Sequence, residues 1–339
     1  MSTITISAGR VPPFARKSFP LTIAYSADET VEDVKKKIAA KNPKSLLLFY
    51  LSTSNENSTS MDRCNCLGTR LLQLYTSRQR LSLKADKKPL ADDAKLRDAG
   101  VGPGAELELK DLGPQVGWKT VFVVEYAGPL LIHPIFYCVP ELFYGRPVVH
   151  SQLQNFVFAM VELHFAKRIF ETLFVHRFSH GTMPFFNIFK NSFHYHVLSG
   201  VFLAYDLYRP AFSASSPYIK GTMRNDETFL YTCAGLWAFF QLSNLLTHLN
   251  LRSLRPVGTK KRAIPFGYGF GLVSCPNYLF ESLAWAVISV MTGSYAAYFF
   301  LVVGTGQMLL WALKKHRNYK KEFGKEYPRG RKAMFPFII

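Results

Sequence analysis

Two apolar segments of the chain, 118–138 and 153–175, contain ionisable side chains. They include Glu125 in the first segment and Glu162, His164, Lys167, Arg168 and Glu171 in the second. A charge inside a membrane-spanning helix is costly, so it usually faces the protein interior and marks a functional site. A spacing of four residues places Lys167 beside Glu171 on a helix. The pattern predicts a site within the bilayer. The alternative is an intrahelical ion pair near the membrane surface, because long basic side chains can reach the interface.

A third segment, 228–249, continues into a stripe of polar and basic residues. Asn244, His248, Arg252 and Arg255 follow at spacings of 4, 4 and 3, which keep them on one helical face. Arginine binds phosphate oxygens in pairs, so this stripe could hold a diphosphate or a phosphorylated ribose. A basic loop against anionic lipid head groups is the alternative.

The run 274–281 predicts a helix that starts within the membrane. Pro276 suits the first turn, and Asn277 and Glu281 share one face. Unpaired amides at a helix start favour negative charge and would help to stabilise a tyrosinate, which makes Tyr278 a candidate proton donor. An interfacial anchor is the alternative reading of this tyrosine.

Two other kinds of site find no support in the sequence. No Gly-x-Gly-x-x-Gly run follows a strand, so a Rossmann site is not expected, and the nine histidines lack zinc-like spacing. The segment 314–323 is predicted to be a basic helix, which either faces lipid and solvent or closes over an anionic cofactor.

Six apolar segments must position these side chains. They run approximately over 118–138, 153–175, 193–208, 228–249, 269–292 and 295–313. Several approach the roughly 20 residues that a helix needs to cross a bilayer, whereas the third is short. With the N-terminus in the cytosol, the cytosolic loops carry 16 Lys and Arg and the opposite loops carry 4, as the positive-inside rule requires. This distribution explains the net charge of +18 better than nucleic-acid binding does, because no nucleic-acid motif is present.

The predicted fold is therefore an α-helical, multi-spanning membrane protein of about six to seven spans with a soluble head. Residues 1–112 form the head and residues 113–339 the membrane-embedded body. The head shows strands near 3–7, 21–24, 79–83 and 105–109 and a helix that starts at Thr30, in the order of a ubiquitin-like α/β domain. The segment 45–74 interrupts this pattern and is interpreted as a disordered loop or a translated intron. No diglycine follows Leu109, so the head predicts docking or structure, not conjugation.

Several motifs together resemble the trans-2-enoyl-CoA reductases of very-long-chain fatty acid elongation, which belong to the steroid 5α-reductase superfamily. The motifs are Glu125–Pro129, Lys167–Ser179, Gly181–Pro184, Leu254–Pro256, Ser274–Tyr278 and His316–Tyr319. The resemblance covers nearly the whole chain apart from 45–74. It implies a multi-pass enzyme of the endoplasmic reticulum membrane, with both termini cytosolic. This enzyme would use NADPH to reduce the 2,3 double bond of a long-chain trans-2-enoyl-CoA. Its implied partners are the other enzymes of the elongase complex: the condensing enzyme, the ketoacyl-CoA reductase and the hydroxyacyl-CoA dehydratase.

The same resemblance implies roles for individual residues. Tyr278 and Glu171, with Lys167 beside them, fall at the catalytic positions, and Glu125 and His164 fall on the substrate side. The positions expected to line the cofactor are Asn244, Arg252, Arg255, Asn277, Glu281 and Tyr319. Phe165 stands where the steroid reductases carry tyrosine, so a hydroxyl at that point is not required here.

Three other functions compete with this interpretation. A steroid or polyprenol double-bond reductase of the same superfamily would share the bundle, but the soluble head argues against it. A membrane methyltransferase would bind S-adenosylmethionine instead of NADPH. A non-catalytic scaffold would leave Glu171 and Tyr278 dispensable.

Overall fold

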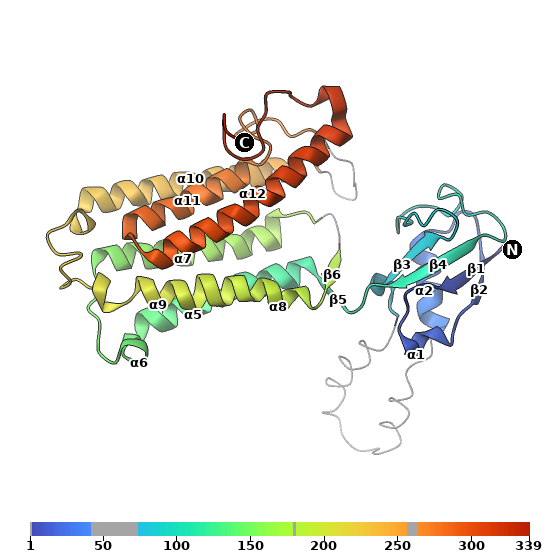
Figure 1. Cartoon of the computed structure of the whole chain (residues 1–339), viewed down its shortest axis with the longest axis horizontal. Coiled ribbons are helices and arrows are strands. Elements are labelled where there is room, and N and C mark those ends of the chain that lie inside the picture. The colour runs from blue at the N-terminus through green and yellow to red at the C-terminus, as the bar shows by residue number, and fades with distance from the viewer. Residues whose placement is uncertain (1, 42–73, 179–180, 256–262) are drawn as a thin grey trace, which may run out of the picture. The chain divides into compact units, whose positions relative to one another are not determined.

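The computed structural model describes residues 2–41, 74–178, 181–255 and 263–339. The chain divides into two compact units (Figure 1). Unit 1 comprises Met1–Gly117 and Thr182–Asn187, and unit 2 comprises Trp118–Gly181 and Ile188–Ile339. The segment 45–74 lies outside the described residues except for Leu74, which is buried in the core of unit 1.

Unit 1 contains a four-stranded mixed sheet with the order β2-β1-β4-β3. The strands are β1 (Ser2–Ala8), β2 (Leu21–Tyr25), β3 (Gln79–Leu83) and β4 (Glu106–Asp111). β1 pairs antiparallel with β2 and parallel with β4, while β3 pairs antiparallel with β4. Alternate residues of β1, Ile4 and Ile6, are fully buried, as expected for a strand with one face on a core. The predicted strands are confirmed within one or two residues at each end.

Two helices belong to unit 1, α1 (Pro13–Arg16) and α2 (Val31–Lys41), and a short 3₁₀ turn, η1 (Thr76–Arg78), precedes β3. The start of α2 is fixed by Thr30, as its sequence predicted. The Thr30 hydroxyl accepts from the amide of Asp33 at 3.3 Å, and the Asp33 carboxylate accepts from the amide of Thr30 at 3.1 Å. This reciprocal pair satisfies two amides that the helix itself cannot bond.

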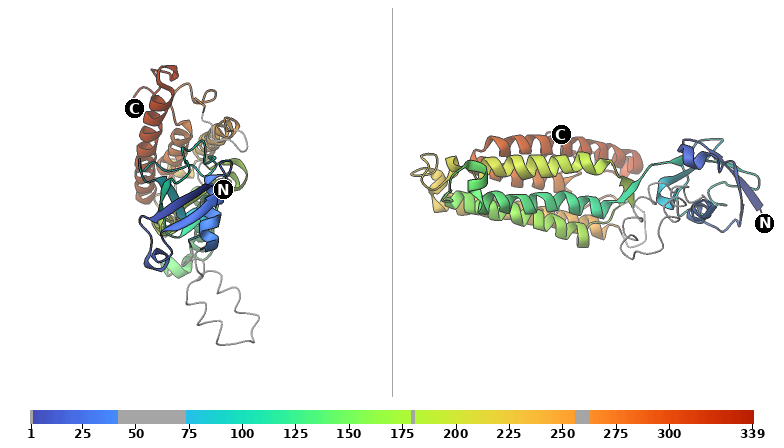
Figure 2. Two further views of the ribbon diagram at one scale, coloured as in Figure 1. Left: turned by 90° about the vertical axis from the view of Figure 1, so that its right-hand side faces the viewer. Right: turned by 90° about the horizontal axis from the view of Figure 1, so that it is seen from below.

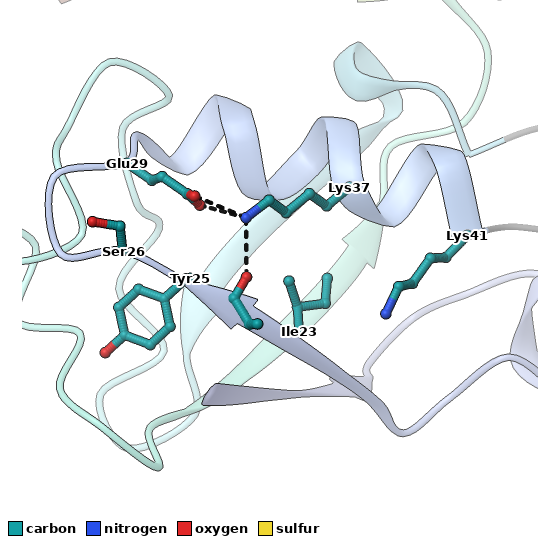
Figure 3. A pocket seen from close by; sticks show the side chains of 7 residues that line it. Ile23, Tyr25, Ser26, Glu29, Lys37 and Lys41 are labelled. Atoms are coloured by element: carbon teal, nitrogen blue, oxygen red, sulfur yellow. Dashed lines mark hydrogen bonds and ion pairs between the residues drawn. The ribbon is translucent and has the colours of Figure 1, made fainter. Parts of the chain in front are cut away.

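A surface pocket lies between α2 and β2, an outer strand of the sheet (Figure 3). Lys37 Nζ donates to the carbonyl of Ala24 at 2.9 Å and to the Glu29 carboxylate at 2.7 Å. Charged side chains of this kind protect a sheet edge from pairing with another strand. No predicted site residue lines the pocket. We interpret its charged side chains as protection of the β2 edge.

A second, two-stranded sheet was not predicted from the sequence. β5 (Gln115–Gly117) pairs antiparallel with β6 (Thr182–Pro184). Residues 182–184 were predicted to lie in a loop of the membrane body, whereas the structure groups them with unit 1. Three-residue strands 65 residues apart in the sequence carry too little local pattern to be recognised.

Unit 2 is a bundle of helices that run alongside one another (Figures 1 and 2). The longer elements are α5 (Trp118–Cys138), α7 (Gln152–Phe170), α10 (Glu227–Ser253), α11 (Pro276–Thr292) and α12 (Tyr295–Phe323). The shorter α-helices are α6 (Pro140–Tyr144), α8 (Asn187–Ser192) and α9 (Leu203–Leu207). Two π-helical stretches interrupt the bundle, η2 (Glu171–Val175) after α7 and η3 (Phe193–Phe202) between α8 and α9. Three short 3₁₀ turns complete the unit, η4 (Pro210–Phe212), η5 (Met223–Asn225) and η6 (Gly324–Glu326).

Three helices of the described chain are long and apolar enough to cross a membrane: α5, α10 and α12 with its continuation to Glu326. Large apolar side chains also lie on the outside of the bundle, such as Leu131, Leu242 and Val302, each more than 60% exposed. An exposed apolar surface of this extent marks contact with lipid or protein. We conclude that unit 2 is a membrane unit.

Two helix ends follow their own sequence patterns, although the approximate apolar segments had other bounds. The segment 269–292 becomes helical only at Pro276, because this proline occupies the first turn of α11. The last segment continues past residue 313 to Phe323, so the basic run 314–323 extends the same helix, as its own pattern predicted.

α5 and η3 approach each other closely at Gly128. A Cβ atom added to Gly128 would lie 1.9 Å from the ring of His196. His196 Nε2 in turn lies 2.9 Å from the carbonyl oxygen of Val124, so the ring is held in this position. The missing side chain at Gly128 thus permits the contact.

We expect Gly128→Ala to destabilise the protein by about 1–3 kcal/mol, because the ring of His196 must move and give up its hydrogen bond. Thermal unfolding of the detergent-solubilised protein measures this. The matched control is Gly304→Ala on α12, where a Cβ meets nothing within 4 Å. An equal change in both variants would contradict the close-contact explanation.

Candidate active site

The Glu171 carboxylate lies at the centre of a buried cluster of charged side chains. Its Oε1 atom is 3.0 Å from both Lys167 Nζ and His248 Nδ1, and its Oε2 atom is 2.8 Å from Arg168 Nη1. The Glu171 side chain is fully buried. Two cations and an imidazole therefore surround one carboxylate inside the apolar bundle, as burial of a charge requires.

Backbone geometry contributes to this arrangement. α7 changes from α-helical to π-helical turns at Glu171. A π-helical turn accommodates an extra residue and is often found at functional sites. The predicted pairing of Lys167 with Glu171 is present, and Arg168 joins it from the same helix.

α10 and α11 are tied to α7 through one asparagine. Lys167 Nζ donates to Asn244 Oδ1 at 2.5 Å, and Asn244 Nδ2 donates to the carbonyl of Asn277 at 2.8 Å. Three helices thus meet at a single buried amide. This chain of bonds brings together three of the predicted residues from distant parts of the sequence.

A second polar group lies beside this cluster. His164 Nε2 is 3.3 Å from Glu281 Oε1, and His164 Nδ1 is 2.9 Å from Gln241 Nε2. Two oxygens of this group are buried without a hydrogen-bond partner among the described residues: the second carboxylate oxygen of Glu281, Oε2, and the amide oxygen of Gln241, Oε1. A buried acceptor without a donor is costly, which makes these two atoms candidates for contact with a ligand. Gln241 was missed from the sequence because an uncharged amide gives no signal in a charge pattern.

Glu125 is also buried and incompletely bonded. It is 1% exposed, and its Oε1 atom has no hydrogen-bond partner in the described part of the chain. Asn191 of α8 and Arg168 are its polar neighbours. Its position on α5, next to the residues of α7, agrees with a place at the edge of the same site.

Tyr278 lies in the first turn of α11, where the structure confirms Pro276 as the first residue. Its ring packs against Cys275, Ala312 and Met334, and Lys315 Nζ lies 5.3 Å from the ring centroid. The Tyr278 side chain therefore faces α12, whereas the backbone carbonyl of the neighbouring Asn277 accepts from Asn244. Among the described side chains, no hydrogen bond or ion pair joins Tyr278 to Glu171.

The predicted cofactor-binding residues occupy different environments. The polar stripe on α10 runs from the interior to the surface: Asn244 and His248 are buried, whereas Arg252 is exposed. Arg255 Nη1 donates to the carbonyl of Arg177 at 2.8 Å, and Arg177 Nη1 donates to the carbonyl of Arg255. This reciprocal pair fixes two guanidinium groups at the end of α10.

Tyr319 lies on the extension of α12 that carries the basic run. Its ring stacks on Tyr327 with centroids 5.7 Å apart. Tyr327 in turn bonds the hydroxyl of Ser274 at 2.6 Å, just before α11 begins. The predicted position of Tyr319 is thus linked to the start of the helix that carries Asn277 and Tyr278.

Glu171, His176 and His248 could also be read as metal ligands, since their ligand atoms lie within 4.8 Å of one another. Burial, and then the positive charge of Arg168, lowers the pKa of His176 to about 3, so its ring is neutral. Both Glu171 oxygens, however, already bind cations, and Lys167 and Arg168 would repel a metal ion. We interpret the three residues as part of the ion-pair cluster.

Comparison with known proteins identifies the family. The family model described as 3-oxo-5-alpha-steroid 4-dehydrogenase matches residues 181–339. A Dictyostelium discoideum protein named very-long-chain enoyl-CoA reductase is 40% identical over 295 residues, which are 85% of this chain and 95% of that protein. The chain belongs to the enoyl-CoA reductase family.

Two further relatives have similar coverage. A Schizosaccharomyces pombe protein whose name describes it as an enoyl reductase is 49% identical over 280 residues, 83% of this chain and 92% of its own. A Caenorhabditis elegans protein named as a very-long-chain enoyl-CoA reductase is 39% identical over 324 residues, 93% of this chain and 92% of its own. The matched family model begins after α7, so it covers α10 and α11 of the reductase site but not Glu171.

We expect Glu171→Gln to lower the free energy of unfolding of this enoyl-CoA reductase by about 3–5 kcal/mol, because Lys167 and Arg168 lose their buried counter-charge. Glu162→Gln on the same helix is the matched control, since Glu162 Oε1 is buried without a hydrogen-bond partner in the described chain. Its neutralisation should be neutral or stabilising. Thermal unfolding of both purified variants tests this, and a similar loss in the two would refute the central role of Glu171.

Proposed function

We propose that the protein reduces the 2,3 double bond of long-chain trans-2-enoyl-CoA with NADPH, as the last step of the very-long-chain fatty acid elongation cycle. The observation that carries this proposal is the buried Glu171 cluster, located inside a membrane bundle of a chain that belongs to the enoyl-CoA reductase family. Ionisable groups inside a membrane bundle usually serve function.

The reaction needs charge stabilisation and a proton. A thioester carbonyl makes C3 of the enoyl group electrophilic, and NADPH, when bound, supplies a hydride to this atom. The substrate then becomes an enolate, which takes a proton at C2. The protein must therefore hold the thioester, stabilise the enolate oxygen and deliver the proton.

Tyr278 is our proposed proton donor to C2. Lys315 lies beside its ring, and this positive charge would stabilise the tyrosinate that remains after proton transfer. Asn277, the preceding residue, is anchored through Asn244 to Lys167. Glu171 and Lys167 would thus act on Tyr278 by holding the first turn of α11 in place and by setting the local charge.

The residues at the end of α10 fit a phosphorylated dinucleotide. Arg252 and Arg255 offer guanidinium groups that suit phosphate oxygens, and Tyr319 offers an aromatic face. Deeper in the bundle, Asn244, Asn277 and Glu281 would hold the nicotinamide and its ribose. The unpaired Glu281 Oε2 fits this role, because an amide N–H or a ribose hydroxyl would supply its missing donor.

The substrate would lie on the other side of the cluster. Glu125 and His164 are buried polar residues on α5 and α7, next to apolar helices that suit an acyl chain. We propose that these two residues face the enoyl thioester.

The remaining features support an enzyme of the endoplasmic reticulum membrane with about six to seven spans and both termini in the cytosol. The excess of Lys and Arg in one set of loops supports this orientation. The order β2-β1-β4-β3, with β1 and β4 parallel and α2 in the core, supports a ubiquitin-like fold for the head. We propose that the protein works beside the condensing enzyme, the ketoacyl-CoA reductase and the hydroxyacyl-CoA dehydratase of the elongase complex.

The purified protein should oxidise NADPH in the presence of trans-2-hexadecenoyl-CoA and release hexadecanoyl-CoA. Tyr278→Phe should abolish this turnover while the variant remains folded and inserted in the membrane, because only the hydroxyl is removed. Loss of NADPH absorbance and mass spectrometry of the acyl-CoA product measure the reaction. Full activity in Tyr278→Phe would remove this residue from the mechanism.

Tyr298→Phe, on the exposed face of α12, is the control variant. A second arm offers a 4-ene-3-ketosteroid, because the matched family model describes a steroid dehydrogenase. Turnover of the steroid without turnover of the enoyl-CoA would replace our proposal with the steroid reductase.

A further inference from the structure

The Tyr126 hydroxyl lies at the edge of the Glu171 cluster. Tyr126 is 2% exposed, and Arg168 Nη2 donates to its hydroxyl oxygen at 2.8 Å. The other amino group of Arg168 binds Glu171. One guanidinium group therefore fixes both the carboxylate and the phenol.

The Tyr126 ring is held as firmly as its hydroxyl. It stacks on Phe122 of the same helix, lies against Phe165 of α7 and meets Tyr195 of η3 edge to face with centroids 5.1 Å apart. The Arg168 guanidinium carbon also lies 5.0 Å from the ring centroid. Contacts from three helical elements leave this side chain little freedom, which is a requirement for a preorganised site.

This environment makes the Tyr126 hydroxyl a strong donor. Because its oxygen accepts a bond from a cation, its own proton becomes more positive, as in other hydrogen-bond chains. The side chain of Tyr195 also interacts with Tyr126. Beside the pair lies the unbonded Oε1 atom of Glu125, so this corner of the bundle contains a buried polar group that the described residues leave incomplete.

We propose that Tyr126 donates a hydrogen bond to the thioester carbonyl oxygen of the substrate and stabilises the enolate oxygen. This inference rests on the proposed function. When hydride adds to C3, the electron pair of the 2,3 double bond moves to the bond between C1 and C2, and the carbonyl pair moves to oxygen. Tyr126 keeps its proton throughout, and C2 receives its proton from Tyr278. The two tyrosines thus have separate tasks.

The two phenols come from different helices and have different neighbours. Tyr278 packs on the α12 side of α11, whereas Tyr126 reaches the cluster from α5 and is bound to its arginine. Phe165 contacts the Tyr126 ring but carries no hydroxyl, so α7 offers no phenol of its own at this contact. The Tyr126 hydroxyl would donate to the negatively charged enolate oxygen, and Arg168 behind it would add a positive charge. Both contributions stabilise an enolate.

A chromophoric substrate analogue tests the contact without turnover. The probe is trans,trans-2,4-hexadecadienoyl-CoA bound to the full-length protein with NADP⁺, since its absorbance moves to longer wavelength when the carbonyl oxygen accepts a stronger hydrogen bond. We expect a red shift with the natural protein and its loss in Tyr126→Phe, which should still bind the probe. With trans-2-hexadecenoyl-CoA and NADPH, kcat should fall about 100-fold with little change in KM.

Tyr137→Phe is the matched control, because Tyr137 lies on the same helix and bonds Asn155 instead. It should keep both the red shift and the turnover. If Tyr126→Phe does not fold, difluorotyrosine at position 126 replaces it, and this stronger donor should increase the red shift. A retained shift in Tyr126→Phe, or an unchanged shift with difluorotyrosine, would overturn this inference alone. Absence of enoyl-CoA reduction by the natural protein would instead overturn the proposed function.

Discussion

The structure of the membrane unit depends on one buried negative charge. A carboxylate in an apolar bundle is stable only if cations and hydrogen-bond donors approach it closely. Glu171 obtains these from Lys167 and Arg168 of its own helix and from His248 of α10. Because the cost of an unpaired charge is high, the positions of α7 and α10 are fixed relative to each other by this group as well as by apolar packing.

The same charges extend the constraint to the other helices. Lys167 binds Asn244, whose amide holds the backbone of α11, and Arg168 binds the hydroxyl of Tyr126 on α5. Four helices thus share one continuous network. Such a network holds reactive groups within narrow limits, and that precision is what an oxidoreductase needs to position hydride donor, thioester and proton donor together.

The two units are stabilised in different ways. Unit 1 has an apolar core in which alternate strand residues pack against α2. Its buried Arg78 donates two hydrogen bonds to the Asp111 carboxylate, at 2.8 and 2.5 Å. Unit 2 carries apolar side chains on its outside and buries one cluster of charged side chains around Glu171. This inversion follows from the solvent, because lipid accepts leucine and phenylalanine but not an isolated charge.

The sequence by itself determined the elements and the chemical character of the site. Strand alternation and the Thr30 cap located the head, apolar length located the three helices that can cross a membrane, and the charges of 153–175 located the cluster. These signals are local, since each depends on residues within a few turns of one another.

Only the tertiary structure decided which residues meet. Two of its bonds join residues at least 33 positions apart: Asn244 binds the Asn277 backbone, and Arg168 binds Tyr126. The structure also leaves the side-chain oxygen of Gln241 without a partner among the described residues. It also set Tyr278 beside Lys315 of α12, a contact between residues 37 positions apart. Spacing along one helix fixes a face, but the partner of that face depends on how the helices pack.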